Sequence, residues 1–199
     1  MGGGPRHVEV RRHAPRGPDG LLTPAGWALA GRVGQRLGRR YAAVLTGTAP
    51  RCIQTARAFG FPNYRIDPAF DSPPAEALAA LLPQIRRAAE EKALTLLEAF
   101  LRVPATRDLL FEAGERLLGA VRHVAERLPR GGRALAIGHA GSIEPALLLA
   151  AGAYSGGPFD FFRECEGAAF TVEGGEVLAV GRLPLETSDG PHRPSGPAV

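Results

Sequence analysis

The sequence predicts an α/β fold: a three-layer sandwich with a mostly parallel central sheet flanked by helices, plus a helical insertion. Two observations support this prediction. Short apolar or alternating segments, typical of strands, recur along the chain, and most are followed by a longer segment with the periodicity of an amphipathic helix. Strands that alternate with helices usually pair in parallel and carry helices on both faces of the sheet.

The length of the chain suits one domain. Its 199 residues are enough to bury a substantial core. We expect the domain to span residues 1–190, with residues 68–130 forming a helical insertion or lid and the helix after it. Residues 191–199 lie in a stretch rich in proline and glycine, and we expect them to form a flexible tail.

The chain begins with a predicted strand, a charged turn and a helix. Residues 7–10, HVEV, alternate in the manner of a short strand. Thr23 is a favourable N-cap residue, and Pro24 suits the first helical position. The predicted helix is supported by apolar side chains at helical spacing, namely Trp27, Ala30, Val33 and Leu37.

Two further strands and a helix are predicted in the next segment. Residues 42–48, AAVLTGT, form a compact apolar run that suits a buried strand. Residues 49–60 resume a helical pattern, and Gly60 suits the position just beyond the helix end. Residues 64–67, YRID, suit a third strand.

The middle of the chain is predicted to be helical. Residues 73–100 are rich in Ala, Leu and Glu, and a second helical stretch runs from about 106 to 128. No strand signal interrupts these residues. We therefore expect them to form a helical excursion beside the sheet.

The C-terminal part returns to the strand and helix pattern. Residues 133–139, RALAIGH, are the clearest buried strand, and residues 140–152 read as a helix with an apolar face. Residues 167–183 contain two strands joined at Glu173-Gly174-Gly175, which is a hairpin signal.

Composition excludes several classes of protein. With 45% hydrophobic and 22% charged residues, the chain reads as a soluble globular protein. No apolar run is long enough for a transmembrane helix, so no membrane partner is expected. The N-terminus, MGGGPRHVEV, lacks the apolar segment of a secretory signal, so we expect a cytoplasmic protein.

The cysteines and the charge balance narrow the choice further. Cys52 and Cys165 are the only cysteines and have no metal-ligand spacing, so we expect reduced, structural thiols, no metal and no cofactor. The net charge of +4 comes from arginine spread over the whole chain, with lysine only at Lys92. Aromatic residues do not interleave with basic runs, which argues against nucleic-acid binding. Small anionic substrates remain compatible.

Three predicted strands end in residues that bear chemistry. The first ends in Arg12-His13, the second in a loop that leads to Arg51, and the fourth in His139. In open α/β sheets, ligands bind at the carboxyl ends of the strands. We therefore expect these side chains to meet at one edge of the sheet.

Imidazoles beside guanidinium groups suit phosphoryl transfer. Arginine matches phosphate oxygens with two parallel hydrogen bonds and stays charged at any working pH. A neutral imidazole can attack phosphorus and form a phosphohistidine. A second, protonated imidazole can stabilise the charge of the transition state. This chemistry needs no metal.

At these residues the chain resembles the histidine phosphatase superfamily, also called phosphoglycerate-mutase-like. Arg12-His13-Ala14 resembles the Arg-His-Gly signature of the family, and LTPAG at 22–26 matches its next helix start. GTAPRCIQTA at 47–56 resembles the second signature, with Gly47 where Ser is usual, and AIGHAGSI at 136–143 resembles the strand that runs into His-Gly. The four matches occur in the family's order.

The resemblance implies a role for each matched residue. His13 is the nucleophile, and Arg12, Arg51 and His139 form the phosphate pocket. Arg16 is an additional candidate, because RHAPRGP also resembles the signature of the acid-phosphatase branch. The His-Asp pair of that branch is absent, since Ala140 follows His139. Length and motif order favour the smaller branch, which holds mutases, small-molecule phosphatases and phosphohistidine phosphatases.

The general acid is the weakest part of the resemblance. An alkyl phosphoester needs a proton donor for its leaving group, usually a carboxylic acid. Asp71 and Glu76 are the candidates, although neither falls in the family's register. Without such an acid, phosphohistidine, acyl phosphates or aryl phosphates would be the preferred substrates.

The remaining polar residues are interpreted as structural. Strand alternation turns Arg11 away from Arg12. Three histidines and one glutamate are expected on the surface or in the tail, with Glu144 kept in view because it lies one turn after His139: His7, His123, His192 and Glu144.

The sequence therefore predicts a metal-independent phosphatase that hydrolyses a small phosphomonoester through a phosphohistidine on His13. The alternatives are a phosphatase of protein phosphohistidine, a phosphoglycerate mutase, and a catalytically weak module that binds phosphorylated ligands. The sequence does not define the oligomeric state.

Overall fold

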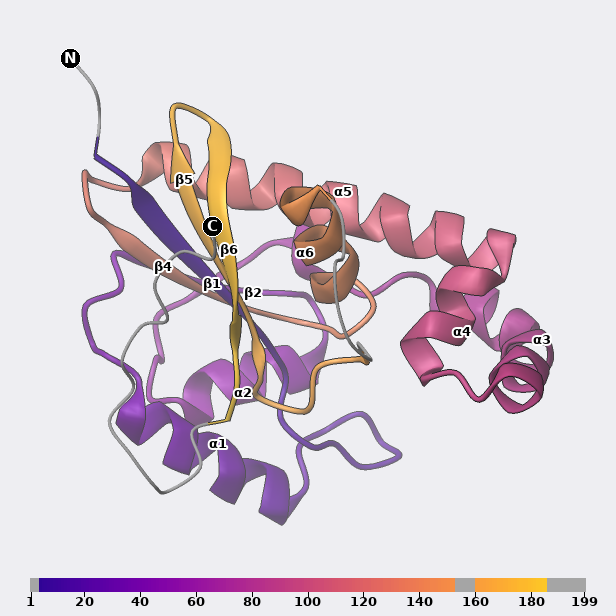
Figure 1. Ribbon diagram of the computed structural model, residues 1–199. Coiled ribbons are helices and arrows are strands. Elements are labelled where there is room, and N and C mark those ends of the chain that lie inside the picture. The colour runs from indigo at the N-terminus through magenta and orange to yellow at the C-terminus, as the bar shows by residue number, and fades with distance from the viewer. Residues whose placement is uncertain (1–3, 153–159, 186–199) are drawn as a thin grey trace.

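The computed structural model describes residues 4–152 and 160–185 and places a six-stranded sheet at the centre of the molecule (Figure 1). The strand order is β3-β2-β4-β1-β5-β6. The strands are β1 (Arg6–Arg12), β2 (Ala43–Thr46), β3 (Arg65–Ile66), β4 (Arg133–Gly138), β5 (Gly167–Glu173) and β6 (Glu176–Leu183).

The pairing of the strands confirms the predicted α/β class. β1 pairs in parallel with β4, and β2 pairs in parallel with both β4 and β3. β5 pairs antiparallel with β1 and with β6. The hairpin between β5 and β6 turns at Gly174 and Gly175, whose φ angles of 60° and 85° favour glycine.

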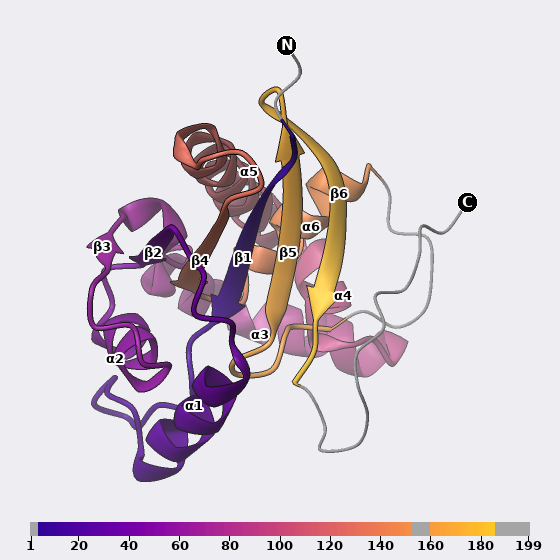
Figure 2. The ribbon, with the colours of Figure 1, turned by 90° about the vertical axis from the view of Figure 1, so that its left-hand side faces the viewer.

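Helices cover both faces of the sheet, as the sequence predicted. α1 (Pro24–Arg36) and α2 (Pro50–Ala58) lie on one face, whereas α5 (Pro104–Arg127) and α6 (Ile143–Ala151) lie on the other (Figure 2). The side chains of each strand alternate between these two layers. In β4, Ala134 and Ala136 join the core under α5, and Leu135 and Ile137 join the core under α1 and α2.

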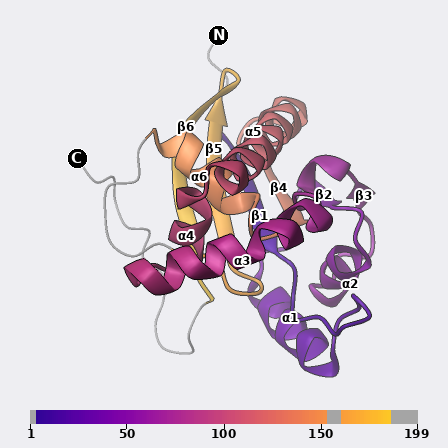
Figure 3. The same ribbon diagram turned by 90° about the vertical axis from the view of Figure 1, so that its right-hand side faces the viewer.

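The helical excursion between β3 and β4 consists of two helices that precede α5. They are α3 (Ala75–Lys92) and α4 (Leu96–Arg102), and they lie beyond the carboxyl ends of β1 and β4 (Figure 3). The prediction of one helical stretch over 73–100 is therefore wrong in detail. Ala93 adopts a left-handed φ of 48° and ends α3, and Thr95 then caps α4 in a reciprocal pair with Glu98.

The predicted boundaries near the sheet edge agree well with the structure. The Thr23 side chain accepts a hydrogen bond from Gly26 N, and Pro24 begins α1. Gly60, with a φ of 86°, follows the end of α2. A Cβ at Gly34 would lie 2.4 Å from Phe59 Cα, so this glycine permits the close packing of α1 against the end of α2.

Three other expectations have different outcomes. Glu144 was expected on the surface but is fully buried. The fold accommodates its carboxyl group because the backbone nitrogens of Gly141 and Phe162 donate hydrogen bonds to it. The predicted tail at 191–199, which contains His192, lies outside the described residues. Within the described part of the chain, the structure contains no helix that is both long and apolar enough to span a membrane.

Candidate active site

The structure brings the carboxyl ends of β1 and β4 and the start of α2 together around one cavity. Its volume is about 680 Å³, and it lies between the loop after β1 and the segment that leads into α3. Five of the residues singled out from the sequence line it, and we call it the phosphate cavity after the ligand that the sequence predicts: Arg12, His13, Arg16, Arg51 and His139. Residues from distant parts of the chain therefore form one cationic site with two imidazoles.

His13 is held with one ring nitrogen available for attack. Its Nδ1 lies 2.8 Å from the carbonyl oxygen of Ala14, which can only accept, so Nδ1 carries the proton and Nε2 carries the lone pair. Burial is the main cause that lowers the pKa of His13 to about 4, and the charges of Arg51, Arg12 and Arg16 lower it further. The imidazole is thus neutral at pH 7.

His139 lies directly beside His13, with ring centroids 5.1 Å apart and the planes inclined by 67°. Its Nδ1 accepts a hydrogen bond of 3.3 Å from Arg51, so its Nε2 carries the proton, 3.3 Å from the sulfur of Cys52. Burial and the nearby Arg51 lower the pKa of His139 to about 3. His139 is therefore neutral in the free protein, whereas the expected protonated imidazole refers to the protein with a bound phosphoryl group.

The arginines differ in how firmly they are held. Arg12 donates to the carbonyl oxygen of Phe162 at 2.6 Å and to Glu164 at 2.7 Å. Burial lowers the pKa of Arg51, whose Nε is buried without a hydrogen-bond partner among the described residues. Arg16 is exposed and donates to the carbonyl oxygen of Gly17. Arg12, with two hydrogen bonds, is therefore held more firmly than Arg51 or Arg16.

The loop that carries Arg16 is attached to α1 and α2. A Cβ at Gly26 would lie 2.1 Å from the carbonyl oxygen of Pro15, so glycine permits the loop to rest on the first turn of α1. Leu22 forms a bridge with Arg16 and donates from its backbone to Gln54 of α2. These contacts place an exposed guanidinium at the mouth of the cavity.

The two acid candidates lie in different surroundings. Asp71 accepts hydrogen bonds of 2.7 Å from both the backbone nitrogen and the hydroxyl of Thr48, and its Oδ1 lies 4.0 Å from His139 Nε2. Glu76 is exposed in the first turn of α3 and does not line the cavity. Of the two, only Asp71 approaches the imidazoles.

Gly47 explains how Asp71 reaches this position. A Cβ at residue 47 would lie 2.5 Å from Oδ1 of Asp71 and 3.2 Å from the carbonyl oxygen of Phe70. The family pattern has Ser where this chain has Gly47. The missing side chain leaves the space that the Asp71 carboxylate occupies. A side chain at residue 47 would displace Asp71.

Two glutamates near the site were not among the predicted site residues, although Glu144 was kept in view for its position after His139. Glu164, in an irregular segment without periodicity, is the only carboxylate that lines the cavity among the described residues, and it pairs with Arg12. Glu144 accepts from Phe162 N at 2.7 Å and from Gly141 N at 2.6 Å. Because the carbonyl oxygen of Phe162 accepts from Arg12, Glu144 anchors the segment that holds this arginine.

Glu144 is also a titratable group in an apolar setting. Burial raises its pKa to about 7, although its backbone hydrogen bonds act in the opposite direction. Its position along the chain, one helical turn after His139, was the sole sequence signal that Glu144 lies near the site.

Residues 4–152 and 160–185 contain no cluster of three or more His, Cys, Asp or Glu side chains that could hold a metal ion.

The fold and this constellation define a class of protein, and comparison with known families agrees. The family described as histidine phosphatase superfamily (branch 1) matches residues 6–172. The chain therefore belongs to the histidine phosphatase superfamily, and the resemblance found in its sequence is confirmed. No match was found among curated proteins.

Solved structures with the same fold include mutases and phosphatases. Phosphoglycerate mutase from Bacillus anthracis str. Sterne is similar with a TM-score of 0.64 at 14% identity, over 91% of this chain and 93% of that one. Phosphoserine phosphatase from Entamoeba histolytica has a TM-score of 0.64 at 11% identity, over 92% and 98% of the two chains. A mycobacterial glucosyl-3-phosphoglycerate phosphatase has a TM-score of 0.57 at 16% identity, over 83% and 92%.

Proposed function

We propose that this protein is a phosphatase that hydrolyses small phosphomonoesters through a phosphohistidine on His13. The observation that carries the proposal is the neutral His13, with its Nε2 lone pair available, in a cavity shared with Arg12, Arg51 and His139. Membership of the histidine phosphatase superfamily supports phosphatase-type activity in general. The cavity volume of about 680 Å³ suits a small substrate.

In the first step, Nε2 of His13 attacks phosphorus while the ester oxygen leaves. The new bond is N–P, the bond that breaks is P–O, and the leaving oxygen takes up a proton. Arg12 and Arg51 bind the phosphoryl oxygens and stabilise the charge that spreads over them in the transition state. Because Nδ1 of His13 already donates to Ala14, the ring is oriented before the substrate arrives.

His139 contributes a hydrogen bond to the phosphoryl group. In the free protein it is neutral, with the Nε2 proton beside the sulfur of Cys52 and Nδ1 as an acceptor, so Nδ1 can donate only after the ring gains a proton. A bound phosphoryl group brings negative charge beside the ring, which favours the protonated imidazole. His139 thereby gains a positive charge when the substrate binds, rather than holding it beforehand.

In the second step, water attacks the phosphohistidine, the N–P bond breaks, and inorganic phosphate is released. Asp71 is the acid proposed to protonate the leaving oxygen in the first step, and as a carboxylate it would then take a proton from the attacking water. Its proximity to His139 supports this role. Neither Asp71 nor Glu76 lines the cavity, but Glu76 is exposed in the first turn of α3, whereas Asp71 lies 4.0 Å from His139, so Asp71 alone is retained.

The first test measures hydrolysis of p-nitrophenyl phosphate by the wild-type protein and by His13→Ala. We expect turnover by the wild type and a loss of several orders of magnitude in the variant, as for other nucleophile deletions. A matched control is His123→Ala, because His123 is exposed on α5 and lies outside the cavity. Equal turnover in the wild type and His13→Ala would contradict the proposal.

A second test separates the phosphatase from a mutase and from a binding module. On incubation with 3-phosphoglycerate, we expect any reaction to release inorganic phosphate and to form no 2-phosphoglycerate. Formation of 2-phosphoglycerate would identify a mutase. Absence of turnover with aryl, alkyl and phosphohistidine substrates, together with measurable binding of phosphate, would identify a binding module and overturn the proposal.

A further inference from the structure

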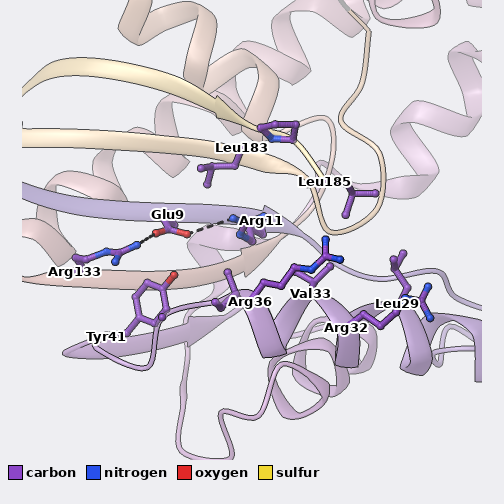
Figure 4. Close-up of a pocket in the computed structure, with 13 residues that line it drawn as sticks. Glu9, Arg11, Leu29, Arg32, Val33, Arg36, Tyr41, Arg133, Leu183 and Leu185 are labelled. Carbon is purple, nitrogen blue, oxygen red and sulfur yellow. Dashed lines mark hydrogen bonds and ion pairs between the residues drawn. The ribbon is translucent and has the colours of Figure 1, made fainter. Parts of the chain in front are cut away.

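A second cavity lies on the face of the sheet that α1 covers. It has a volume of about 570 Å³ and shares no lining residue with the phosphate cavity. Its floor is formed by Glu9 and Arg11 of β1 and Arg133 of β4, and one wall by Leu29 and Val33 of α1 (Figure 4). We call it the α1 cavity. Its size lies within the range of small-molecule sites.

The floor of the α1 cavity holds a buried carboxylate between two arginines. Glu9 and Arg11 are only 6% and 8% exposed. Glu9 Oε1 accepts a hydrogen bond from Arg133 Nη2, and Glu9 Oε2 lies 3.6 Å from Arg11 Nη2. One negative charge is therefore shared by two positive charges, and the floor is left with a net positive charge that no other described lining residue neutralises.

Arg11 is held in place rather than disordered at a surface. Its Nη1 donates to the carbonyl oxygen of Cys165 at 3.1 Å, whereas its Nε is buried and has no hydrogen-bond partner among the described residues. These contacts fix the Arg11 guanidinium at the floor, where its charge acts on any group that enters the cavity.

The remaining lining is both cationic and apolar. Arg32 and Arg36 of α1 also line the cavity, and Arg32 adds a third guanidinium group to those of Arg11 and Arg133. Leucine and valine side chains line the walls between them, namely Leu29 and Val33 of α1, Leu183 at the end of β6, and Leu185 just after it (Figure 4). Leu37, the C-cap residue of α1, also lines the cavity. The cavity therefore offers positive charge at the floor and mouth and an apolar surface between them.

We propose that the α1 cavity is a binding site for a small organic anion with an apolar body, such as a carboxylic acid that bears an aliphatic chain or an aromatic ring. The anionic group pairs with the arginines, and the apolar body covers the leucine walls. A bare inorganic anion would leave the walls exposed to water. An uncharged apolar molecule would leave the excess positive charge of the floor without a partner.

This site is separate from catalysis. Arg11 and Arg12 are consecutive on β1, and their side chains line different cavities because strand side chains alternate. No imidazole, thiol or hydroxyl nucleophile other than the phenol of Tyr41 lines the α1 cavity among the described residues. The burial of Tyr41 and the charge of Glu9 raise the pKa of that phenol, which keeps it protonated. The α1 cavity is thus suited to binding and not to covalent chemistry.

The test uses the fluorescent probe 8-anilinonaphthalene-1-sulfonate, which carries one sulfonate on an aromatic body. We expect saturable binding to the full-length protein, displacement by octanoate, and displacement by 1-octanol that is weaker by about tenfold, because the alcohol lacks the charge. Inorganic phosphate should not displace the probe at concentrations that inhibit p-nitrophenyl phosphate hydrolysis.

Two variants test the location, and each has a matched control. Val33→Trp fills the cavity, and Arg32→Glu reverses a charge at its mouth; each should weaken octanoate binding by about tenfold or more. Ala28→Trp places the same side chain on an exposed position of α1 outside the lining, and Arg122→Glu makes the same charge change on α5 across the sheet. Both controls should bind octanoate as the wild type does.

The outcome does not depend on the proposed function. Octanoate binding should be unchanged in His13→Ala, so a failure of the phosphatase proposal would leave this result intact. The α1 cavity proposal is overturned if the probe and octanoate do not bind, if 1-octanol competes as well as octanoate, or if Val33→Trp and Arg32→Glu bind like their controls.

Discussion

The two cavities receive consecutive arginines from the same strand, yet they differ in what surrounds the cations. Arg12 lies in the phosphate cavity beside two neutral imidazoles, whereas Arg11 lies in the α1 cavity beside the carboxylate of Glu9. In both places we propose that arginine binds an anion. Under these proposals, arginines alone make a binding site, and a desolvated histidine with an available lone pair makes one of the two sites reactive.

The largest expected effect distinguishes arginines that touch the reacting group from arginines that do not. Arg51→Ala should lower kcat/KM for p-nitrophenyl phosphate by about 10²–10³-fold, as expected for the loss of a donor to developing negative charge. Arg32→Ala, in the α1 cavity, should change it by less than about twofold, since exposed charges outside a site have small effects. Steady-state kinetics of both variants measures these changes. A similar loss of kcat/KM in both would contradict the assignment of Arg51, and not Arg32, to the reacting group.

The next prediction concerns the acid. Asp71→Asn should lower kcat/KM for an alkyl substrate such as glycerol 2-phosphate by about 10²-fold. The loss for p-nitrophenyl phosphate should be less than about tenfold, because its leaving group needs little protonation. Glu76→Gln is the matched control and should behave as wild type with both substrates. Equal losses on alkyl and aryl substrates would show that Asp71 supports the structure and does not donate the proton.

A smaller effect is expected at Glu144, which anchors the segment that holds Arg12. Glu144→Gln keeps an acceptor for Phe162 N but replaces the acceptor for Gly141 N, and should reduce the free energy of unfolding by about 1–3 kcal/mol near pH 5. The pKa of Glu144 rises from 4.5 to about 7 on folding. Its contribution to stability is therefore complete below pH 4.5 and declines as the pH rises through about 7.

Urea unfolding of the two proteins between pH 4.5 and 8 measures this effect. The difference in unfolding free energy between wild type and Glu144→Gln should shrink as the pH rises, since only the wild type loses a proton from this site. His13 and His139 act in the opposite direction, because folding lowers their pKa values from 6.5. Their contribution to stability is present above pH 6.5 and is lost as the pH decreases below that value. They are present in both proteins and cancel in the difference, so a constant difference would refute the titration of Glu144.

The smallest effect is expected at Arg16. Its guanidinium is exposed at the mouth of the phosphate cavity, where water and salt screen the charge. Arg16→Ala should raise KM by about two- to fivefold and leave kcat within about twofold. A fall in kcat as large as that of Arg51→Ala would place Arg16 on the reacting group instead.

Much of the fold follows from local patterns. The apolar run of β4, the cap at Thr23 and the glycines of the β5–β6 hairpin each predict an element by themselves. The break between α3 and α4 was missed, because Ala93 is a good helix former and only its left-handed backbone ends the helix. Periodicity says nothing about such a turn.

The candidate site likewise contains residues that the sequence predicts and residues that it does not. Arg12, His13, Arg51 and His139 follow from motif order and the strand-end rule, since each lies where a strand or its following loop reaches the sheet edge. Glu164 carries no signal, because it lies in an irregular segment and meets Arg12 only through tertiary structure. The burial of Glu144 likewise depends on Phe162, which is distant in the chain.

The most direct test of the central claim is capture of the covalent intermediate. Because p-nitrophenol is a good leaving group, formation of the phosphohistidine should be fast compared with its hydrolysis. The protein would be mixed rapidly with p-nitrophenyl phosphate, quenched with alkaline denaturant to preserve the N–P bond, and mapped by mass spectrometry. We predict a single phosphorylated peptide with the phosphoryl group on His13; turnover with no phosphoryl group on His13, or with the group on His139, would contradict the account.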